Sequence, residues 1–342
     1  MGPVISPDTR IVLLPGADTR VLGLSSRVRN ARVAARSGAS VVDGAREPYD
    51  EQAAAYFVPS DVMIDRSLFP LPPVGGPVRI QADGQHVFDL RTRAARRHAA
   101  WAILVRTSKP SDGHIARRFN RPISRVVSFA LLSLGLSASQ ASILTLFAGL
   151  VGAAVAAHPG YLSFVTAGIL FKASSILDGV DGEIARATLT ESEAGVRLDT
   201  LVDHLTYVAF FIGVMIGWAR EGSANQVAIW AVVIAGGLVL SFLRGARFVS
   251  EHAPDASFAF IDRSVRRAAR DSSGTTLRTA ASLFTLLRRD VFAVIFLFVS
   301  FTGLRALVPA LVAFGVLLAN FTLSVYDREL AAAAALERLA SN

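Results

Sequence analysis

Four aspartates in the middle of the chain have the residue type and the spacing for metal-assisted chemistry. Asp178 and Asp181 lie in the run Asp-Gly-Val-Asp-Gly-Glu-Ile-Ala-Arg at residues 178–186, and Asp199 and Asp203 follow. Strongly apolar segments flank both pairs. Carboxylates at membrane depth are costly and are usually retained for function. The cluster, with glycines beside it, predicts a site for a hard divalent cation and a phosphate-bearing substrate.

Helical geometry places these acids on two stripes. At roughly 100° per residue, Asp181 lies about 60° around its helix from Asp178. The next helix carries Gly195, Asp199 and Asp203 at four-residue intervals. Two helices joined by a short polar loop pack as antiparallel neighbours. We therefore expect the two stripes to converge near one end of the pair.

Four converging carboxylates would repel one another strongly unless cations neutralise them. Oxygen ligands favour Mg²⁺, Mn²⁺ or Ca²⁺ over zinc, and one or two ions would suffice. The small residues Gly182, Ala185 and Gly195 leave room for a nucleotide, and Arg186 can pair with a phosphate bidentately. This set predicts displacement at phosphorus, with Asp203 as the base that takes a proton from an attacking hydroxyl.

A proton or cation pathway, or acids paired structurally with arginine, would also place aspartates in such helices. The number of specified positions at fixed spacing disfavours both alternatives.

The run resembles the signature of the CDP-alcohol phosphotransferase family. That signature reads Asp, two residues, Asp-Gly, two residues, Ala-Arg, eight residues, Gly, three residues, Asp, three residues, Asp. This sequence matches it at every position, with Asp178, Asp181, Gly182, Ala185, Arg186, Gly195, Asp199 and Asp203.

The resemblance implies a metal-dependent integral membrane enzyme, often a homodimer. Such an enzyme transfers a substituted phosphate from a CDP-linked donor to an acceptor hydroxyl and releases CMP. By the family pattern, Mg²⁺ or Mn²⁺, as two ions, would be held by the four aspartates, with Asp203 also serving as the base. The residues that would surround the cytidine diphosphate are Gly182, Ala185, Arg186 and Gly195.

Composition limits the function classes. The chain has 342 residues, is 52% hydrophobic and contains no cysteine, so disulfides and thiolate metal sites are excluded. The net charge of +8 comes almost entirely from arginine. With so many apolar runs, this excess favours an anionic membrane face or an anionic substrate over nucleic acid.

The composition changes near residue 109. Residues 1–108 predict a small soluble α/β domain, and residues 109–342 an all-α polytopic membrane domain. In the first part we expect a strand at Arg10–Pro15, a helix with exposed arginines at Leu24–Gly38 and a hairpin at Val78–Leu90 around Asp83-Gly84. Residues 94–105 fit either a helix or a strand.

The first domain resembles, at its start, the nucleotidyltransferases that are fused to some members of the family. A working domain of that kind needs a phosphate loop with a lysine or arginine. Residues 16–20 form a poor version, and no lysine precedes Lys109. We therefore expect a degenerate domain that regulates, docks or dimerises without chemistry of its own.

The membrane domain is predicted to begin with an interfacial amphipathic helix at His114–Gly135, basic at its start and bent or reset at Pro122. Hydropathy then predicts six spanning helices, at Ser139–Ala157, Gly160–Arg186, Gly195–Trp218, Ala224–Ser250, Val291–Thr302 and Arg305–Val325.

Orientation follows from the loop charges. The connection at residues 251–289 is rich in arginine, so the positive-inside rule places that face, both termini and the active site in the cytoplasm. In a bacterium this would be the inner membrane. Arg263–Arg270 could bind anionic lipid headgroups or form a solvated helix face.

Acceptor recognition has weaker signals. Arg244 and Arg247 share one face at the end of the fourth predicted span, where they could bind an acceptor such as inositol phosphate or anchor the helix. Lys172 could snorkel, pair with an acid on another helix or reach the acceptor. Asn120, Arg121 and Ser124 resemble a family pattern to which we assign no role.

The expected function is transfer from a CDP-diacylglycerol or CDP-inositol type of donor to an inositol phosphate or lipid acceptor, in phospholipid or inositol-phosphate-type synthesis. A non-catalytic metal or ion transporter and a membrane scaffold are the alternatives. A transporter would move metal without releasing CMP. A scaffold would tolerate Asp199→Asn.

Overall fold

The computed structural model describes residues 9–252 and 289–340, apart from residues 17, 70, 73, 110, 111 and 114. It divides into two compact units. The first contains Met1–Thr145 and Ile176–Asp203, and the second contains Leu146–Ser175 and His204–Asn342. The predicted domain boundary at residue 108 stays a prediction.

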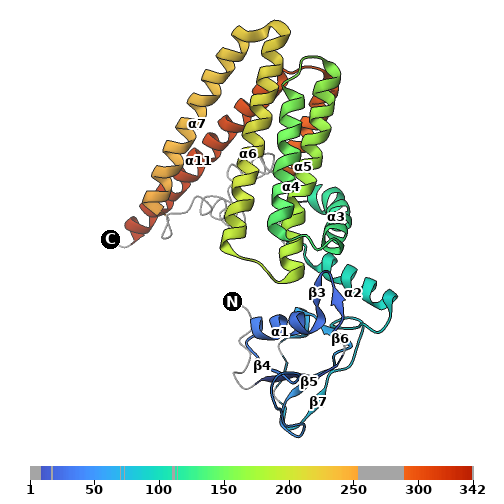
Figure 1. Cartoon of the computed structure of the whole chain (residues 1–342). Coiled ribbons are helices and arrows are strands. Elements are labelled where there is room, and N and C mark those ends of the chain that lie inside the picture. Colours follow the sequence, from blue (N-terminus) through green and yellow to red (C-terminus); the bar gives the residue numbers. More distant parts are fainter. Residues whose placement is uncertain are drawn as a thin grey trace. The chain divides into compact units, whose positions relative to one another are not determined.

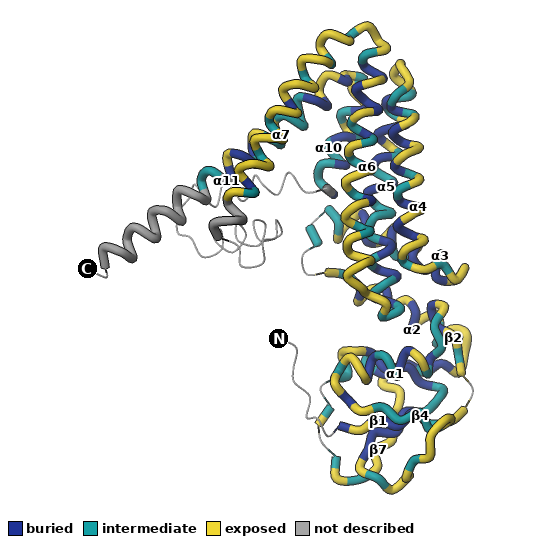
Figure 2. Tube along the Cα trace, turned by 60° about the vertical axis from the view of Figure 1, so that its left-hand side comes forward, coloured by how far each residue is buried: buried dark blue, intermediate teal, exposed yellow. Residues whose placement is uncertain are grey.

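A parallel sheet forms the centre of the N-terminal part of the first unit. Its strand order is β4-β1-β5-β7, with all neighbours parallel. The helix α1 packs on the sheet, as Figures 1 and 2 show, through an apolar cluster that includes Ile11, Val33 and Ile64. The strands are β1 (Arg10–Leu13), β4 (Ser40–Asp43), β5 (Tyr56–Val58) and β7 (Val78–Arg79).

The helix α1 (Ser26–Arg36) confirms the helix expected at Leu24–Gly38. Ser25 caps its start by accepting a hydrogen bond from the Val28 amide at 3.1 Å, which satisfies one of the amides that lack a helical partner. The expectation of exposed arginines is wrong for Arg29, whose side chain is buried. The Arg29 side chain instead donates a hydrogen bond to the backbone carbonyl of Ala187, a distant contact that the helical periodicity of residues 24–38 does not reveal.

The predicted hairpin at Val78–Leu90 is wrong. β7 pairs with β5, whereas β8 (Val87–Asp89) pairs antiparallel with β6 (Val62–Ile64). The turn at Asp83-Gly84 does form, because the Asp83 carboxylate accepts hydrogen bonds from the amides of residues 85–87 at 2.6–2.8 Å. It connects strands of two different sheets, and alternation of apolar residues cannot distinguish that arrangement from a hairpin.

Residues 94–105, left open between helix and strand, belong to α2 (Arg93–Arg106), which Thr92 caps. A short hairpin of β2 (Arg20–Val21) and β3 (Leu24–Ser25) precedes α1. A 3₁₀ turn lies at η1 (Arg66–Leu68). The expected amphipathic helix is present as η2 (Ala116–Asn120) followed by α3 (Arg121–Ser133), with Pro122 at the first turn of α3. Pro122 does not restart the helix, because Asn120 and Arg121 before it both have right-handed helical backbone angles.

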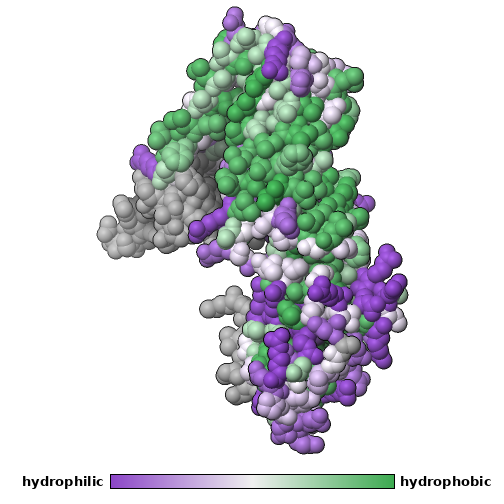
Figure 3. Space-filling model, viewed as in Figure 1, coloured by the Kyte–Doolittle hydropathy of each residue, from purple (hydrophilic) through white to green (hydrophobic). Residues whose placement is uncertain are grey.

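The remaining helices are long and apolar. They are α4 (Ala138–Ala156), α5 (Tyr161–Thr188), α6 (Glu193–Trp218), α7 (Ala224–His252), α10 (Arg289–Thr302) and α11 (Leu307–Ala340). The five-residue turn η3 (Ala219–Ser223) connects α6 to α7. Figure 3 shows apolar side chains gathered over this helical part, while polar ones cover the N-terminal domain. The combination is that of a small α/β region followed by membrane-type helices.

Each of the six predicted spans falls on one of these helices. Three continuous stretches in the described residues are long and apolar enough to cross a membrane, at Ala138–Ala156, Tyr161–Thr188 and Glu193–Arg247. The last contains both α6 and α7, on either side of Gly222, which has a φ of 90°. Two further apolar helices, Asp290–Thr302 and Leu307–Thr322, are shorter. The count of six spans and the interfacial position of α3 therefore stay predictions.

The second unit has its own core. Phe171 stacks on Phe210 with ring centroids 4.1 Å apart, and the edge of Phe296 meets both rings. Arg305 donates hydrogen bonds to the carbonyls of Ala156, His158 and Gly160. The arginine-rich stretch Arg263–Arg270, proposed above to meet lipid headgroups, lies outside the described residues.

Candidate metal and nucleotide site

The last turns of α5 and the first turns of α6 carry the whole motif, all within the first unit. Residues 189–192 connect the two helices. Leu189 has a φ of 57°, a conformation that a residue with a Cβ adopts only at a cost. At the start of α6 the Ser192 hydroxyl accepts a hydrogen bond from the Gly195 amide at 3.1 Å. A tight, capped connection thus sets the two stripes side by side.

Three of the four aspartates converge. One carboxylate oxygen from each of Asp178, Asp199 and Asp203 lies within 4.8 Å of the others. Mg²⁺, Mn²⁺ and Ca²⁺ bind oxygens at roughly 2.0–2.6 Å, so the ligands of one ion lie up to roughly 4–5 Å apart. The spacing and the all-oxygen donor set therefore fit one hard divalent ion.

Asp181 does not belong to this group of three. Its carboxylate accepts a hydrogen bond from the Ser142 hydroxyl of α4 at 2.5 Å and another from the Gly182 amide at 2.5 Å. The residue is only 7% exposed. These hydrogen bonds occupy both oxygens of the Asp181 carboxylate, which a second ion would need as ligands. A second ion therefore stays a prediction.

A cavity of about 430 Å³ adjoins the carboxylates, which is within the roughly 300–1,000 Å³ of typical small-molecule sites. All four residues predicted to surround the nucleotide line it. The lining consists of Gly182, Ala185, Arg186 and Gly195 together with Lys109, Ser137, Ala138, Ser139, Ser142, Asp181, Thr190, Glu191, Ser192, Val196 and Asp199. Lys109 adds a cation that the sequence did not assign to the site.

Arg186 lies over Gly182. A Cβ placed on Gly182 would come within 2.9 Å of Arg186 Nη1 and 3.3 Å of Nη2. The Nε of Arg186 donates a hydrogen bond to the Thr107 carbonyl at 2.7 Å. This bond fixes the plane of the guanidinium at the cavity wall. The guanidinium fits there because Gly182 has no side chain.

A buried ionic network lies behind the motif, and its centre, Glu183, had no role in the prediction from sequence. The Glu183 carboxylate is fully buried and accepts hydrogen bonds from Arg121 Nη1 at 2.9 Å and from the hydroxyls of Ser124 and Ser128 at 2.7 Å. Arg121 also pairs with Asp112 at 2.8 Å. The family-like pattern at Arg121 and Ser124 was the signal for this network, since both residues contact Glu183.

Three arginines of α1 contact the carboxyl end of α5. Arg29 donates a hydrogen bond to the Ala187 carbonyl. Arg32 and Arg36 donate to the carbonyls of Thr188 and Leu189, each at 2.9 Å. The spacing of these arginines at residues 29, 32 and 36 places them on one helical face, but the sequence carries no signal of the helix end that this face contacts.

The loop after β1 that resembled a phosphate loop is closed. The space lined by Leu13, Asp18 and Ser26 holds only about 10 Å³, far less than a nucleotide needs. The Asp18 carboxylate instead accepts hydrogen bonds from the Arg27 amide and the Ser26 hydroxyl, each at 3.2 Å. Its acid thus organises the start of α1.

The residues predicted to bind the acceptor lie in the second unit. Arg244 Nη1 donates a hydrogen bond to the Ser324 hydroxyl of α11 at 2.9 Å, and Arg247 is exposed on the same helix. Lys172 lies within range of the charge of Asp290, in line with pairing to an acid on another helix. The acceptor role of Arg244 and Arg247 stays a prediction.

The site combines a carboxylate cluster that could hold a metal ion with a nucleotide-sized cavity, and it lies on helices apolar enough to cross a membrane. Residues 138–259 match the family model of the CDP-alcohol phosphatidyltransferases. The match covers α4 to α7 and includes every residue of the motif.

Several curated proteins are similar to part of this chain. The bifunctional IPC transferase and DIPP synthase of Archaeoglobus fulgidus is 32% identical over 52% of this chain and 36% of its own length. The protein of the same name from Thermococcus kodakarensis is 34% identical over 41% of this chain and 31% of its own length. The archaetidylinositol phosphate synthase of Pyrococcus horikoshii is 31% identical over 30% of this chain and 53% of its own length. The matches thus span about a third to a half of these relatives.

Proposed function

We propose that the chain is a membrane-bound CDP-alcohol phosphotransferase. It would transfer a substituted phosphate from a CDP-linked alcohol to an acceptor hydroxyl and release CMP. The observation that carries this proposal is the meeting of Asp178, Asp199 and Asp203 within 4.8 Å, beside the cavity that Gly182 and Arg186 line.

The substrates are proposed from chemistry and similarity together. The similar proteins are named as IPC transferases, DIPP synthases and an archaetidylinositol phosphate synthase. These names favour inositol phosphate as the acceptor or as the alcohol of the donor. A lipid-linked donor such as CDP-diacylglycerol and a soluble one such as CDP-inositol both fit a site at the end of apolar helices.

The residues divide the reaction between them. Asp203 takes the proton of the acceptor hydroxyl, whose oxygen forms a bond to the phosphorus that bears the alcohol. The anhydride oxygen–phosphorus bond breaks, and its electron pair leaves with CMP. Arg186 pairs with a phosphate oxygen of the donor. Bound Mg²⁺ or Mn²⁺, held by the aspartates, would neutralise the diphosphate and the leaving group.

The N-terminal domain supplies no chemistry in this proposal. The closed loop beside Asp18 supports a degenerate nucleotidyltransferase-like domain, and the contacts of Arg29, Arg32 and Arg36 with α5 favour the docking role. We further propose a cytoplasmic active site and a homodimer, on the loop charges and the resemblance given above.

CMP release from a panel of CDP-linked donors and acceptors tests the function, with mass spectrometry of the product. Asp203→Asn should abolish turnover and leave the fold intact. Glu193→Gln is the matched control, because its side chain is 93% exposed on the same helix. Undiminished CMP release by Asp203→Asn would refute the base assignment. Movement of metal across vesicle membranes without CMP release would favour a transporter. Unchanged function of the Asp199→Asn variant would favour a scaffold.

A further inference from the structure

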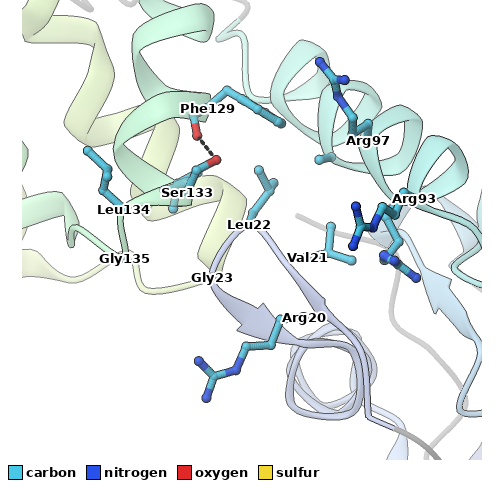
Figure 4. A pocket seen from close by; sticks show the side chains of 13 residues that line it. Arg20, Val21, Leu22, Gly23, Arg93, Arg97, Phe129, Ser133, Leu134 and Gly135 are labelled. Atoms are coloured by element: carbon cyan, nitrogen blue, oxygen red, sulfur yellow. Dashed lines mark hydrogen bonds between the residues drawn. The ribbon is translucent and has the colours of Figure 1, made fainter.

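A second hollow in the first unit has no part in the proposed reaction. It holds about 660 Å³ and lies between the β2–β3 hairpin, α2 and the end of α3. Figure 4 shows Arg93 and Arg97 on one side, Phe129 and Ser133 on the other, and Leu22 between them. Its lining residues are Arg20, Val21, Leu22, Gly23, Arg93, Arg96, Arg97, Ala100, Phe129, Leu132, Ser133, Leu134 and Gly135.

The charge of this groove is entirely positive. Four arginines line it and no carboxylate does. Arg96 Nη1 donates a hydrogen bond to the Leu90 carbonyl at 2.9 Å, which holds one cation at the wall. Arg20, Arg93 and Arg97 are exposed, and within the described part of the chain no acid forms an ion pair with them. Several arginines without an acidic partner favour an anion, and the planar guanidinium groups suit phosphate in particular.

The opposite wall of the groove is apolar. Phe129, Leu132 and Leu134 of the α3 end line it, and Leu134 is 76% exposed. The apolar surface continues along α3 through the exposed side chains of Ile123 and Val126. A free phosphate gains nothing from such a wall, whereas an amphiphile that joins a phosphate to hydrocarbon gains from both walls.

The tip of the β2–β3 hairpin builds the groove at a conformational cost. Leu22 has a φ of 53° and Gly23 a φ of 74°, as a two-residue turn of the mirror-image type requires. Leucine is disfavoured in that conformation, yet Leu22 is buried in the same apolar cluster as Leu132. A Cβ on Gly23 would lie 3.3 Å from the Leu132 carbonyl. The hairpin is therefore seated on α3, and the groove is a formed feature of the fold.

We propose that this groove binds the phosphate headgroup of an anionic membrane phospholipid. The arginines of α2 and β2 would hold the phosphate, and Phe129 and Leu134 would contact the start of the acyl chains. The binding would attach the N-terminal domain to the membrane surface at the end of α3. It is separate from phosphotransfer, since the groove shares no lining residue with the carboxylate cavity.

The test uses the full chain in nanodiscs that contain phosphatidylglycerol with a photo-reactive group near the headgroup, followed by peptide mapping. Labelling should fall on residues 129–135. Arg93→Ala/Arg97→Ala should weaken it about 30-fold, because each basic residue at an anionic membrane surface contributes about fivefold. Arg10→Ala/Arg79→Ala is the matched control and should label as the wild type does, since both arginines are exposed on the small sheet.

Three outcomes would overturn the proposal. One is equal labelling of the Arg93→Ala/Arg97→Ala variant, with its thermal midpoint unchanged. Another is equal labelling by a photo-reactive phosphatidylcholine, which has the same chains and no net charge. The third is loss of labelling on addition of millimolar inorganic phosphate, which would assign the groove to a free anion. Leu134→Ser should reduce labelling by phosphatidylglycerol, and unchanged labelling of that variant would count against the apolar wall.

Discussion

The guanidinium of Arg29 on α1 donates a hydrogen bond to the backbone carbonyl of Ala187 on α5. The last carbonyls of a helix have no intrahelical partner, and the partial negative charge there favours a cation. Arg32 and Arg36 bond the next two carbonyls. Burial lowers the pKa of Arg29 to about 10, partly offset by the charge of Asp65, so the group stays protonated at neutral pH. The N-terminal domain thus caps the helix that carries half of the motif.

Arg29→Ala should therefore destabilise the protein by about 1–3 kcal/mol, because a buried carbonyl loses its donor. CMP release should fall with it, as the carboxyl end of α5 loosens. Thermal unfolding and turnover measure the two effects. Arg10→Ala, at an exposed position on β1, is the control. Arg29→Lys should recover part of the stability, and a wild-type stability of Arg29→Ala would contradict the capping role.

Divalent cations should stabilise the folded protein. At a concentration 100 times the dissociation constant, Mg²⁺ or Mn²⁺ should add about 2.7 kcal/mol by mass action. Asp199→Asn should lose most of this increment, whereas Glu193→Gln should keep it. Thermal midpoints with EDTA and with each metal provide the measurement. An equal increment in wild type and Asp199→Asn would place the ion elsewhere.

Glu183 should matter for stability more than any serine that contacts it. Glu183→Ala leaves Arg121 buried with one partner fewer, and breaking a buried ion pair costs about 3–5 kcal/mol. Ser128→Ala removes one hydrogen bond and should cost about 1 kcal/mol. Chemical or thermal unfolding of both variants measures the difference. Similar losses in the two would mean that the carboxylate is not the centre of this network.

Acidification should weaken the same network through Asp112. Burial raises the pKa of this carboxyl, but the hydrogen bonds and charge of Arg121 lower it by more. Since the folded-state pKa lies below the unfolded value, the unfolded chain binds the proton first as the pH falls. The stabilisation is complete above about pH 5 and is lost progressively below it. The difference in thermal midpoint between wild type and Asp112→Asn should shrink from about pH 5 to pH 3; a constant difference would disprove it.

Gly182→Ala should impair donor binding without unfolding the protein. The new methyl group would meet the Arg186 guanidinium at 2.9 Å, so that flexible group must move from the cavity wall. We expect a rise of about tenfold in KM for the donor, as for the loss of one interaction of about 1.4 kcal/mol. Gly236→Ala is the control, because nothing lies within 4 Å of its added Cβ. A normal KM for Gly182→Ala would remove Arg186 from the phosphate role.

The sequence was sufficient for features that local spacing controls. Helical periodicity placed Asp178 near Asp199 and Asp203. It also placed the small residues Gly182, Ala185 and Gly195 on the faces that line the cavity. Hydropathy located each apolar helix. These predictions held because side-chain period, glycine content and helix length are written in neighbouring residues.

Features that depend on distant partners could not be read in the same way. Nothing near Arg29 signals the Ala187 carbonyl, which is 158 residues away. The pairing of β8 with β6 rather than β7 depends on the competition between edges of the completed sheets. Asp181 was expected with the other acids, but Ser142, on a third helix, provides it with another partner.

The capping of α5 by α1 also restricts how such chains can be recombined. A different front module grafted at residue 108 would leave the carbonyls of residues 187–189 facing a surface that was not selected to meet them. Any replacement must present three hydrogen-bond donors at the same spacing. Without them, the connection between α5 and α6 at residues 189–192 loses the contacts that hold it. For this reason the N-terminal region cannot be replaced freely by an unrelated one.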